Sequence, residues 1–201
     1  MRDTDEVLFA HLATAHQEFG ARLRFVKVPQ WANDTPCGEW TVRDVVRHMV
    51  QGNLIYTSLL HGGSAGEFMS SLDADTLGDD PVDAYERAAA ECRAAFAETG
   101  ALDRKVDYPF GNVTGRRLLG LMISDSVIHT WDLCRGAGLT DRLNGTLVDW
   151  LVDNFERLFH GVAEGPLDPD SSHQYFGRPH PDVPEMSAQQ RLLHWVGRLA
   201  V

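Results

Sequence analysis

The chain has few cysteines and no long hydrophobic run. Its three cysteines, Cys37, Cys92 and Cys134, form no Cys-x-x-Cys pair. Such a sparse and odd count is typical of reduced thiols in a cytoplasmic protein and argues against a disulfide framework. No apolar run approaches the roughly 18 residues of a membrane span, and the acidic start does not resemble a secretory signal. These absences predict a soluble, cytoplasmic protein without a membrane partner.

Positive charge is also scarce. The formal net charge is −11, and only one Arg-Arg pair occurs, at Arg116 and Arg117. Because binding to a phosphate backbone depends on clustered Lys and Arg, we expect no nucleic-acid partner. Neither a Gly-x-Gly-x-x-Gly fingerprint nor a P-loop is present, so nucleotide binding has no support from motifs.

The hydrophobic pattern is helical almost throughout. Apolar residues recur near the 3.6-residue period in five long segments and one short one, residues 3–25, 41–60, 81–100, 114–135, 141–159 and 187–199. Thr41 with Asp44 predicts a capping box, and Pro81 suits the first position of a helix. Residues 64–80 and 165–184 are expected to be irregular, and residues 103–114 extended. The sequence therefore predicts one all-α domain over residues 1–201, an up-down bundle with extra C-terminal helices and a long exit loop.

Two of the predicted helices carry polar residues on otherwise apolar faces. His48 shares its helical face with Val45 and Ile55, while Asp125 and His129, four residues apart, lie one above the other on another helix. A carboxylate buried without a partner is strongly penalised, so Asp125 needs a cation, a donor network or water. Two imidazoles and one carboxylate that point inward from two helices can form a metal site with an open position.

Simpler interpretations stay open for each residue. A lone histidine such as His48 is more often a core histidine bonded to a carbonyl, and Asp125 can pair with His129 without a metal. Asp132, three residues after His129, could be the carboxylate near the site or could accept a hydrogen bond from an imidazole. Cys37 precedes a helix N-terminus, which lowers a thiol pKa, but a small buried spacer is the favoured interpretation.

Two segments together resemble a known family. Residues 35–48, which end in Thr41-Val-Arg-Asp-Val-Val-Arg-His48, and residues 125–138, with Asp125-x-x-x-His129-x-Trp-Asp-Leu, are similar to the metal segments of the mycothiol-dependent maleylpyruvate isomerase metal-binding domain. That family belongs to the DinB/YfiT-like superfamily. Residues 175–177 and 191–198 resemble the tail of a short actinobacterial branch.

The resemblance implies a DinB/YfiT-like four-helix bundle that holds a divalent metal on His48, Asp125 and His129. Zinc is the expected ion and nickel the alternative. Asp132 is expected beside the ligands, and Tyr56 and Met122 are expected to line a pocket. The family has glutamate where this chain has Asp125, so either the helices lie closer or a water bridges to the ion. The resemblance does not extend to the separate C-terminal domain of the isomerase, so isomerisation of maleylpyruvate is not implied.

Three functions follow as hypotheses. The first is a metal-dependent thiol S-transferase or isomerase that uses a low-molecular-weight thiol such as mycothiol on a small electrophile. The second is hydrolysis by a metal hydroxide at the same centre. The third is a non-catalytic bundle that binds a small ligand or forms a homodimer around a vestigial metal site.

Overall fold

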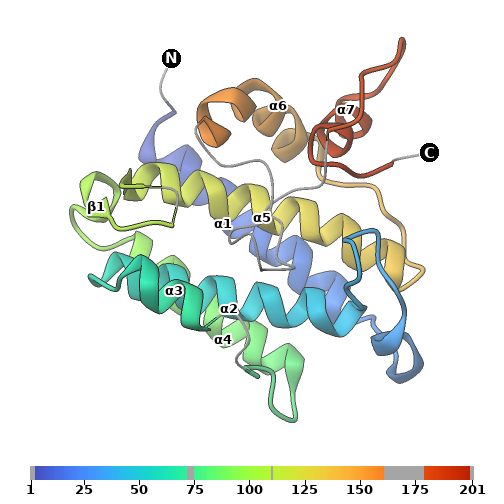
Figure 1. Ribbon diagram of the computed structural model, residues 1–201, viewed down its shortest axis with the longest axis horizontal. Helices are drawn as coiled ribbons and strands as arrows, with labels where there is room; N and C mark the ends of the chain where they lie inside the picture. The colour runs from blue at the N-terminus through green and yellow to red at the C-terminus, as the bar shows by residue number, and fades with distance from the viewer. Residues whose placement is uncertain (1–2, 72–74, 110, 161–178, 200–201) are drawn as a thin grey trace.

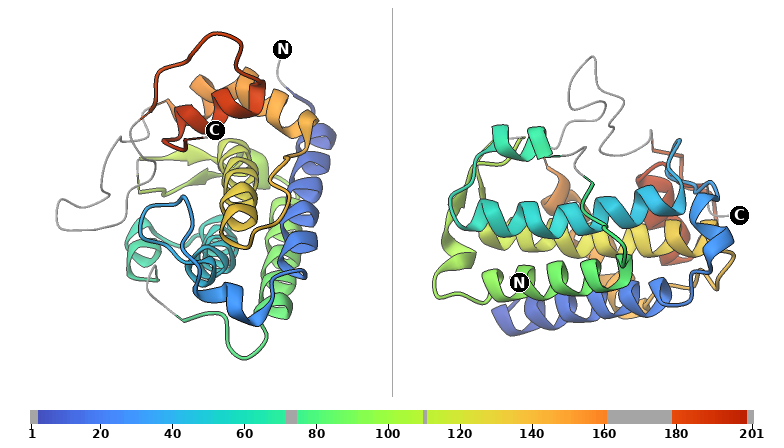
Figure 2. Two further views of the ribbon diagram at one scale, coloured as in Figure 1. Left: turned by 90° about the vertical axis from the view of Figure 1, so that its right-hand side faces the viewer. Right: turned by 90° about the horizontal axis from the view of Figure 1, so that it is seen from below.

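Four long helices form the centre of the molecule. The computed structural model describes residues 3–71, 75–109, 111–160 and 179–199. The long helices in this part are α1 (Asp5–Leu23), α2 (Val42–Leu60), α4 (Pro81–Phe96) and α5 (Gly115–Gly136). Both α1 and α2 pack against α4 and against α5, so the four close into a bundle (Figures 1 and 2). The predicted all-α class is confirmed.

Shorter elements surround this bundle. Helix α6 (Gly145–Phe159) packs on α5, and α7 (Ala188–Trp195) packs on α6, which adds a layer above α5 in Figure 1. Helix α3 (Ala65–Ser71) lies against α2, and β1 (Lys105–Val106) pairs with β2 (Val113–Thr114) in antiparallel register. Two 3-10 turns, η1 (Val28–Ala32) and η2 (Ala101–Asp103), complete the described elements. Within the described ranges, we find no helix with the length and apolarity of a membrane span.

Capping residues set where the helices begin. The Thr41 hydroxyl accepts from the Asp44 N–H, and the Asp44 carboxylate accepts from the Thr41 N–H at 3.0 Å, so the predicted capping box is confirmed. Pro81 occupies the first turn of α4, and Thr114 caps α5. The helix predicted from residue 141 begins later, at residue 145, because Asn144 caps its first turn.

Other predictions need correction. Residues 64–80 are not irregular throughout, because Ser64 and Glu67 cap each other reciprocally and support α3. The helix predicted over 81–100 ends at residue 96, and Gly100 adopts a left-handed conformation before η2. Residues 165–178 of the predicted exit loop, which include the 175–177 segment, lie outside the described residues. The final helix is shorter than predicted and is capped by Ser187.

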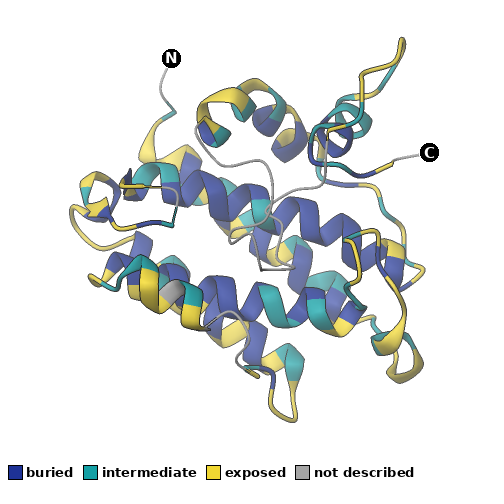
Figure 3. Cartoon of the chain, in the orientation of Figure 1, coloured by how far each residue is buried: buried dark blue, intermediate teal, exposed yellow. Residues whose placement is uncertain are grey.

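Helix α5 is the most enclosed element. The bundle covers one side of it and the α6–α7 layer covers the other, so it is dark blue along most of its length in Figure 3. Buried polar side chains accompany the apolar ones, among them Asp132, which is fully buried. A buried carboxylate requires partners. The polar residues of α5 therefore lie inside the protein, where their contacts decide what they do.

We expect Gly136→Ala to destabilise the protein by about 1–3 kcal/mol, because overpacking at a tight contact forces its neighbours to move. Gly136 ends α5 against the segment that leads into α2. A Cβ there would lie 2.7 Å from methyl groups of Thr35 and Val42 and 3.1 Å from the Asp34 carbonyl oxygen. Urea unfolding measures the change in the free energy of unfolding.

Gly145→Ala is the matched control. Gly145 is the first residue of α6, and a Cβ there would meet no atom within 4 Å. Alanine at this open position should be neutral or stabilise by up to about 1 kcal/mol. Equal stability of the Gly136→Ala variant and the wild type would show that the α5 terminus is not packed as described.

Candidate metal centre

Three predicted side chains meet between α2 and α5. Nε2 of His48 lies 3.1 Å from Oδ2 of Asp125, and Nε2 of His129 lies 3.4 Å from Oδ1 of the same carboxylate. One ligand atom from each residue fits within a set whose members lie no more than 4.8 Å apart. The His48 and Asp125 side chains keep 28% and 24% of their surface exposed, whereas His129 keeps 8%. The cluster is therefore open toward solvent on the His48 side.

The local sequence explains this convergence. His48 follows the capping box of α2 by one helical turn, and Asp125 and His129 occupy one face of α5 at the predicted spacing of four. Gly52, one turn after His48, faces Asp125, and a Cβ there would lie 3.7 Å from Oδ2. Glycine at this position leaves the carboxylate uncovered from the α2 side.

The charges of His48, Asp125 and His129 shift the pKa values of Asp125 and His129. Burial alone raises the pKa of the Asp125 carboxyl, but the His48 and His129 imidazoles outweigh it and hold that pKa well below its usual range. Burial alone lowers the pKa of His129, but the Asp125 charge and hydrogen bonds to Asp125 and Asp132 raise it to about 9. Without a metal, Asp125 is thus an anion beside a protonated His129. A divalent cation would take the place of that proton.

His129 also contacts a buried carboxylate and an aromatic ring. Nδ1 of His129 lies 3.0 Å from Oδ2 of Asp132, and Arg198 donates to both oxygens of Asp132 at 2.9 and 3.3 Å. The Trp40 ring is stacked over the His129 ring at 5.7 Å and lies 4.9 Å from the His48 ring. Asp132 thus lies within hydrogen-bond distance of an imidazole, and its role beside a metal stays a prediction. Trp40 and Arg198 had not been predicted near the site.

A second set of ligand atoms overlaps the first. Cys37, His129 and Asp132 also bring one atom each within 4.8 Å of one another. The Arg198 guanidinium, however, pairs with Asp132 and donates to the Cys37 sulfur at 3.0 Å, and its positive charge opposes a cation at that position. Among the described residues, no Lys or Arg forms an ion pair with Asp125, so the His48, Asp125 and His129 set is the better candidate.

Cys37 is better suited to packing than to chemistry. Burial raises the pKa of its thiol to about 12, although the nearby Arg198 lowers it. A thiol that stays protonated at neutral pH is a poor nucleophile. The favoured interpretation of Cys37 as a small spacer agrees with this environment.

Tyr56 and Met122 are both buried in the bundle core. Met122 lies on the Asp125 side of α5, where its Cε would be 3.9 Å from a Cβ at residue 52. The Tyr56 hydroxyl lies 3.4 Å from that of Tyr108. That these two residues line a substrate pocket stays a prediction.

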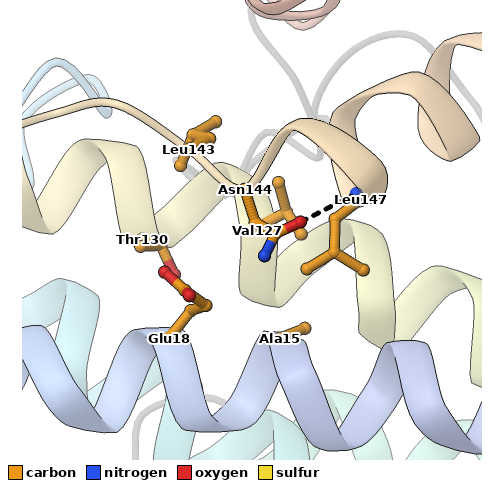
Figure 4. A pocket seen from close by; sticks show the side chains of 7 residues that line it. All are labelled: Ala15, Glu18, Val127, Thr130, Leu143, Asn144 and Leu147. Carbon is orange, nitrogen blue, oxygen red and sulfur yellow. Dashed lines mark hydrogen bonds between the residues drawn. The ribbon is translucent and has the colours of Figure 1, made fainter.

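A small pocket lies elsewhere, between α1, α5 and the start of α6 (Figure 4). Its lining residues are Ala15, Glu18, Val127, Thr130, Leu143, Asn144 and Leu147. It has room for about one water molecule. None of its lining residues belongs to the histidine–aspartate cluster, so it does not serve that site.

Residues 62–66 match the Gly-x-Ser-x-Gly pattern of serine hydrolases. In those enzymes the serine stands on a sharp turn from a strand into a helix. Here α2 precedes the segment, and the Ser64 hydroxyl accepts from the Glu67 N–H at 3.2 Å to cap α3. Ser64 therefore serves as a helix cap, and the match to the hydrolase pattern has no catalytic meaning.

Comparisons with known proteins bear on the family and the fold. The family model of the mycothiol maleylpyruvate isomerase N-terminal domain matches residues 12–134. The uncharacterized protein Rv0738 of Mycobacterium tuberculosis (strain ATCC 25618 / H37Rv) is 29% identical over 182 residues, which cover 90% of this chain and 94% of that protein. The uncharacterized protein MT0763 of strain CDC 1551 / Oshkosh matches equally well.

Solved structures share the fold. The mycothiol-dependent maleylpyruvate isomerase superposes with a TM-score of 0.58 at 18% identity, over 73% of this chain and 67% of that chain. A DinB-like protein from Bacillus subtilis gives 0.55 at 17% identity, over 68% and 95%. The family match covers more than half of the sequence and includes His48, Asp125 and His129. The chain therefore belongs to the mycothiol maleylpyruvate isomerase N-terminal domain family.

Proposed function

We propose that this protein is a metal-dependent enzyme that uses a low-molecular-weight thiol, of the mycothiol type, on a small electrophile. The main support for this proposal is the cluster of His48, Asp125 and His129. Their ligand atoms lie within 4.8 Å of one another on two facing helices. Family membership and the fold of the mycothiol-dependent isomerase support the choice of a thiol. The reaction would be transfer to the electrophile or its isomerisation.

The donor set fits a divalent transition metal. Two imidazole nitrogens and one carboxylate oxygen suit zinc, with nickel as the alternative, and three protein ligands leave a position for another molecule. The aspartate is long enough for this role, because its two oxygens already reach His48 and His129 at 3.1 and 3.4 Å. His48, Asp125 and His129 would hold the ion, which would supply an acidic position that deprotonates a thiol at neutral pH.

The residues around the three ligands would orient the imidazoles and bind the substrates. Asp132 accepts from Nδ1 of His129 and so leaves Nε2 directed at Asp125 and His48. Trp40 covers both imidazoles from one side and shields them from water there. Exposed surface remains on His48 and Asp125, and the thiol and the electrophile would approach from that side. Met122 and Tyr56 would provide apolar walls.

Thiol-dependent consumption of a conjugated or halogenated electrophile tests this function. With zinc and mycothiol present, we expect turnover that falls by about 100-fold or more when the thiol is omitted or the metal is chelated, since both are needed to form the thiolate. His48→Ala should lose turnover in the same way. His61→Ala is the matched control, because His61 pairs with Glu98 at the exposed end of α2. Turnover unchanged by chelation would contradict the proposal.

One observation favours a second candidate, a non-catalytic bundle. His48 and His129 both lie within ion-pair distance of the Asp125 carboxylate, at 3.1 and 3.4 Å. A network of this kind can serve stability alone. A protein that binds no metal, and whose melting temperature falls sharply in the His129→Ala variant, would support this second candidate.

A further inference from the structure

Arg198 reaches the candidate metal centre from the far end of the chain. It follows α7, where Gly197 has a positive φ of 77° and the Arg198 N–H donates to the Leu193 carbonyl at 2.8 Å. This is the hydrogen bond of a glycine-terminated helix end, which reverses the chain direction. The reversal carries the Arg198 side chain inward, and the residue is only 5% exposed.

The buried guanidinium has specific partners. It donates to both oxygens of Asp132, to the Val196 carbonyl at 2.8 Å and to the Cys37 sulfur at 3.0 Å. Asp132 is itself fully buried and shares its Oδ2 with Nδ1 of His129. A chain of contacts therefore runs from Arg198 through Asp132 to His129.

This series of contacts determines which nitrogen of His129 is free to bind a metal. An imidazole that donates from Nδ1 keeps its Nε2 lone pair for a ligand. The two-pronged contact from Arg198 fixes the plane of the Asp132 carboxylate, because a guanidinium presents its donors in a rigid fork. Arg198 also neutralises Asp132, while Asp125 faces the two imidazoles directly.

We propose that Arg198 is a positioning residue of the metal centre and acts through Asp132 on His129. Arg198 follows α7 and lies outside the family match at residues 12–134, so a residue beyond that match contributes to the site. This inference rests on the proposed function, since it assumes that Nε2 of His129 binds the ion.

Three variants test the inference. Arg198→Met leaves the buried Asp132 without its arginine partner and can prevent folding. The double variant Asp132→Asn with Arg198→Met removes both charges and avoids that penalty. Compared with Arg198→Met, the variant Arg198→Lys keeps the positive charge and a donor. Arg93→Met is the matched control, because Arg93 is a partly buried arginine that contacts His16. Circular dichroism establishes which variants are folded.

Zinc affinity, measured by competition with a chromogenic chelator, is the first readout. We expect the double variant to bind zinc about 10- to 100-fold more weakly than the wild type, which is the usual effect of losing an outer partner of a ligand. Arg198→Lys should recover part of the affinity, and Arg93→Met should match the wild type. Equal affinity of the folded double variant and the wild type would overturn the inference.

NMR of the metal-free protein is the second readout and does not require that zinc binds. The Nδ1–H proton of His129 should exchange slowly with water in the wild type and about tenfold faster in the double variant. If the wild type binds no zinc, the proposed function fails, and this exchange rate alone decides the positioning role. Unchanged exchange in the double variant would refute that role.

Discussion

Replacing His129 with alanine is expected to weaken zinc binding by about a thousandfold, because one of three protein ligands is lost. The fold should survive. His48 and Asp125 still pair with each other, and Arg198 still pairs with Asp132, so no charge is left alone in the core. Isothermal titration with zinc measures the affinity, and circular dichroism confirms the helical content.

His61→Ala again provides the control and should bind zinc within about twofold of the wild type, since exposed ion pairs contribute little. Cys37→Ala distinguishes the two overlapping ligand sets. If the ion were bound by Cys37, His129 and Asp132, this variant would lose affinity as strongly as His129→Ala. We expect it to retain wild-type affinity, and a loss would move the metal to the second set.

In the metal-free protein, the free energy of unfolding is expected to fall by roughly 3 kcal/mol as pH rises from 6.5 to about 9. Folding raises the pKa of His129 from its ordinary value of 6.5 to about 9. The folded state therefore keeps a proton that the unfolded state releases. The resulting stabilisation is complete below the unfolded pKa and is lost as pH passes the folded one.

Other charged groups near His129 do not reverse this sign. Asp125 and Asp132 both have lowered pKa values and stay ionised throughout this pH range, and Arg198 stays protonated. Urea unfolding with a chelator present, repeated at several pH values, gives the slope. His129→Gln should remove most of this pH dependence of the free energy of unfolding. Saturating zinc should remove it as well, because the metal displaces the proton on His129. A flat profile in the chelated wild type would contradict the predicted network.

Local patterns in the sequence predicted most of the fold. Helix starts were readable where a capping residue and its partner are close in the chain, as for Thr41 with Asp44. The short helix α3 was missed because acidic and turn-forming residues dominate its surroundings, and its reciprocal cap at Ser64 and Glu67 was not recognised. Boundaries of this kind depend on one pair of capping hydrogen bonds.

The candidate site was predictable only in part. The spacing of Asp125 and His129 places them on one face of a helix, and the apolar helical face of His48 pointed to an inward imidazole. The family resemblance implied that the three residues share one metal. Arg198 and Trp40 could not be placed, because their contacts with the site depend on how distant segments pack. Arg198 meets Asp132 across 66 positions of sequence, and its approach is set by the turn at Gly197. No local periodicity encodes a contact of that kind.

The shorter carboxylate of Asp125 has a structural consequence. The family resemblance left two ways to accommodate it, a closer approach of the helices or a bridging water. Its oxygens lie within 3.4 Å of both imidazoles, so the α2–α5 pair brings the three groups together directly. The aspartate is therefore compatible with direct ligation.

Anomalous diffraction at the zinc absorption edge shows whether His48, Asp125 and His129 hold a metal ion. The crystals would be of the wild-type protein, grown with one equivalent of zinc. We expect a single strong peak bounded by Nε2 of His48, Nε2 of His129 and the Asp125 carboxylate. A peak against Cys37 and Asp132 instead, or no peak in this cluster from protein that is saturated with zinc in solution, would contradict this expectation.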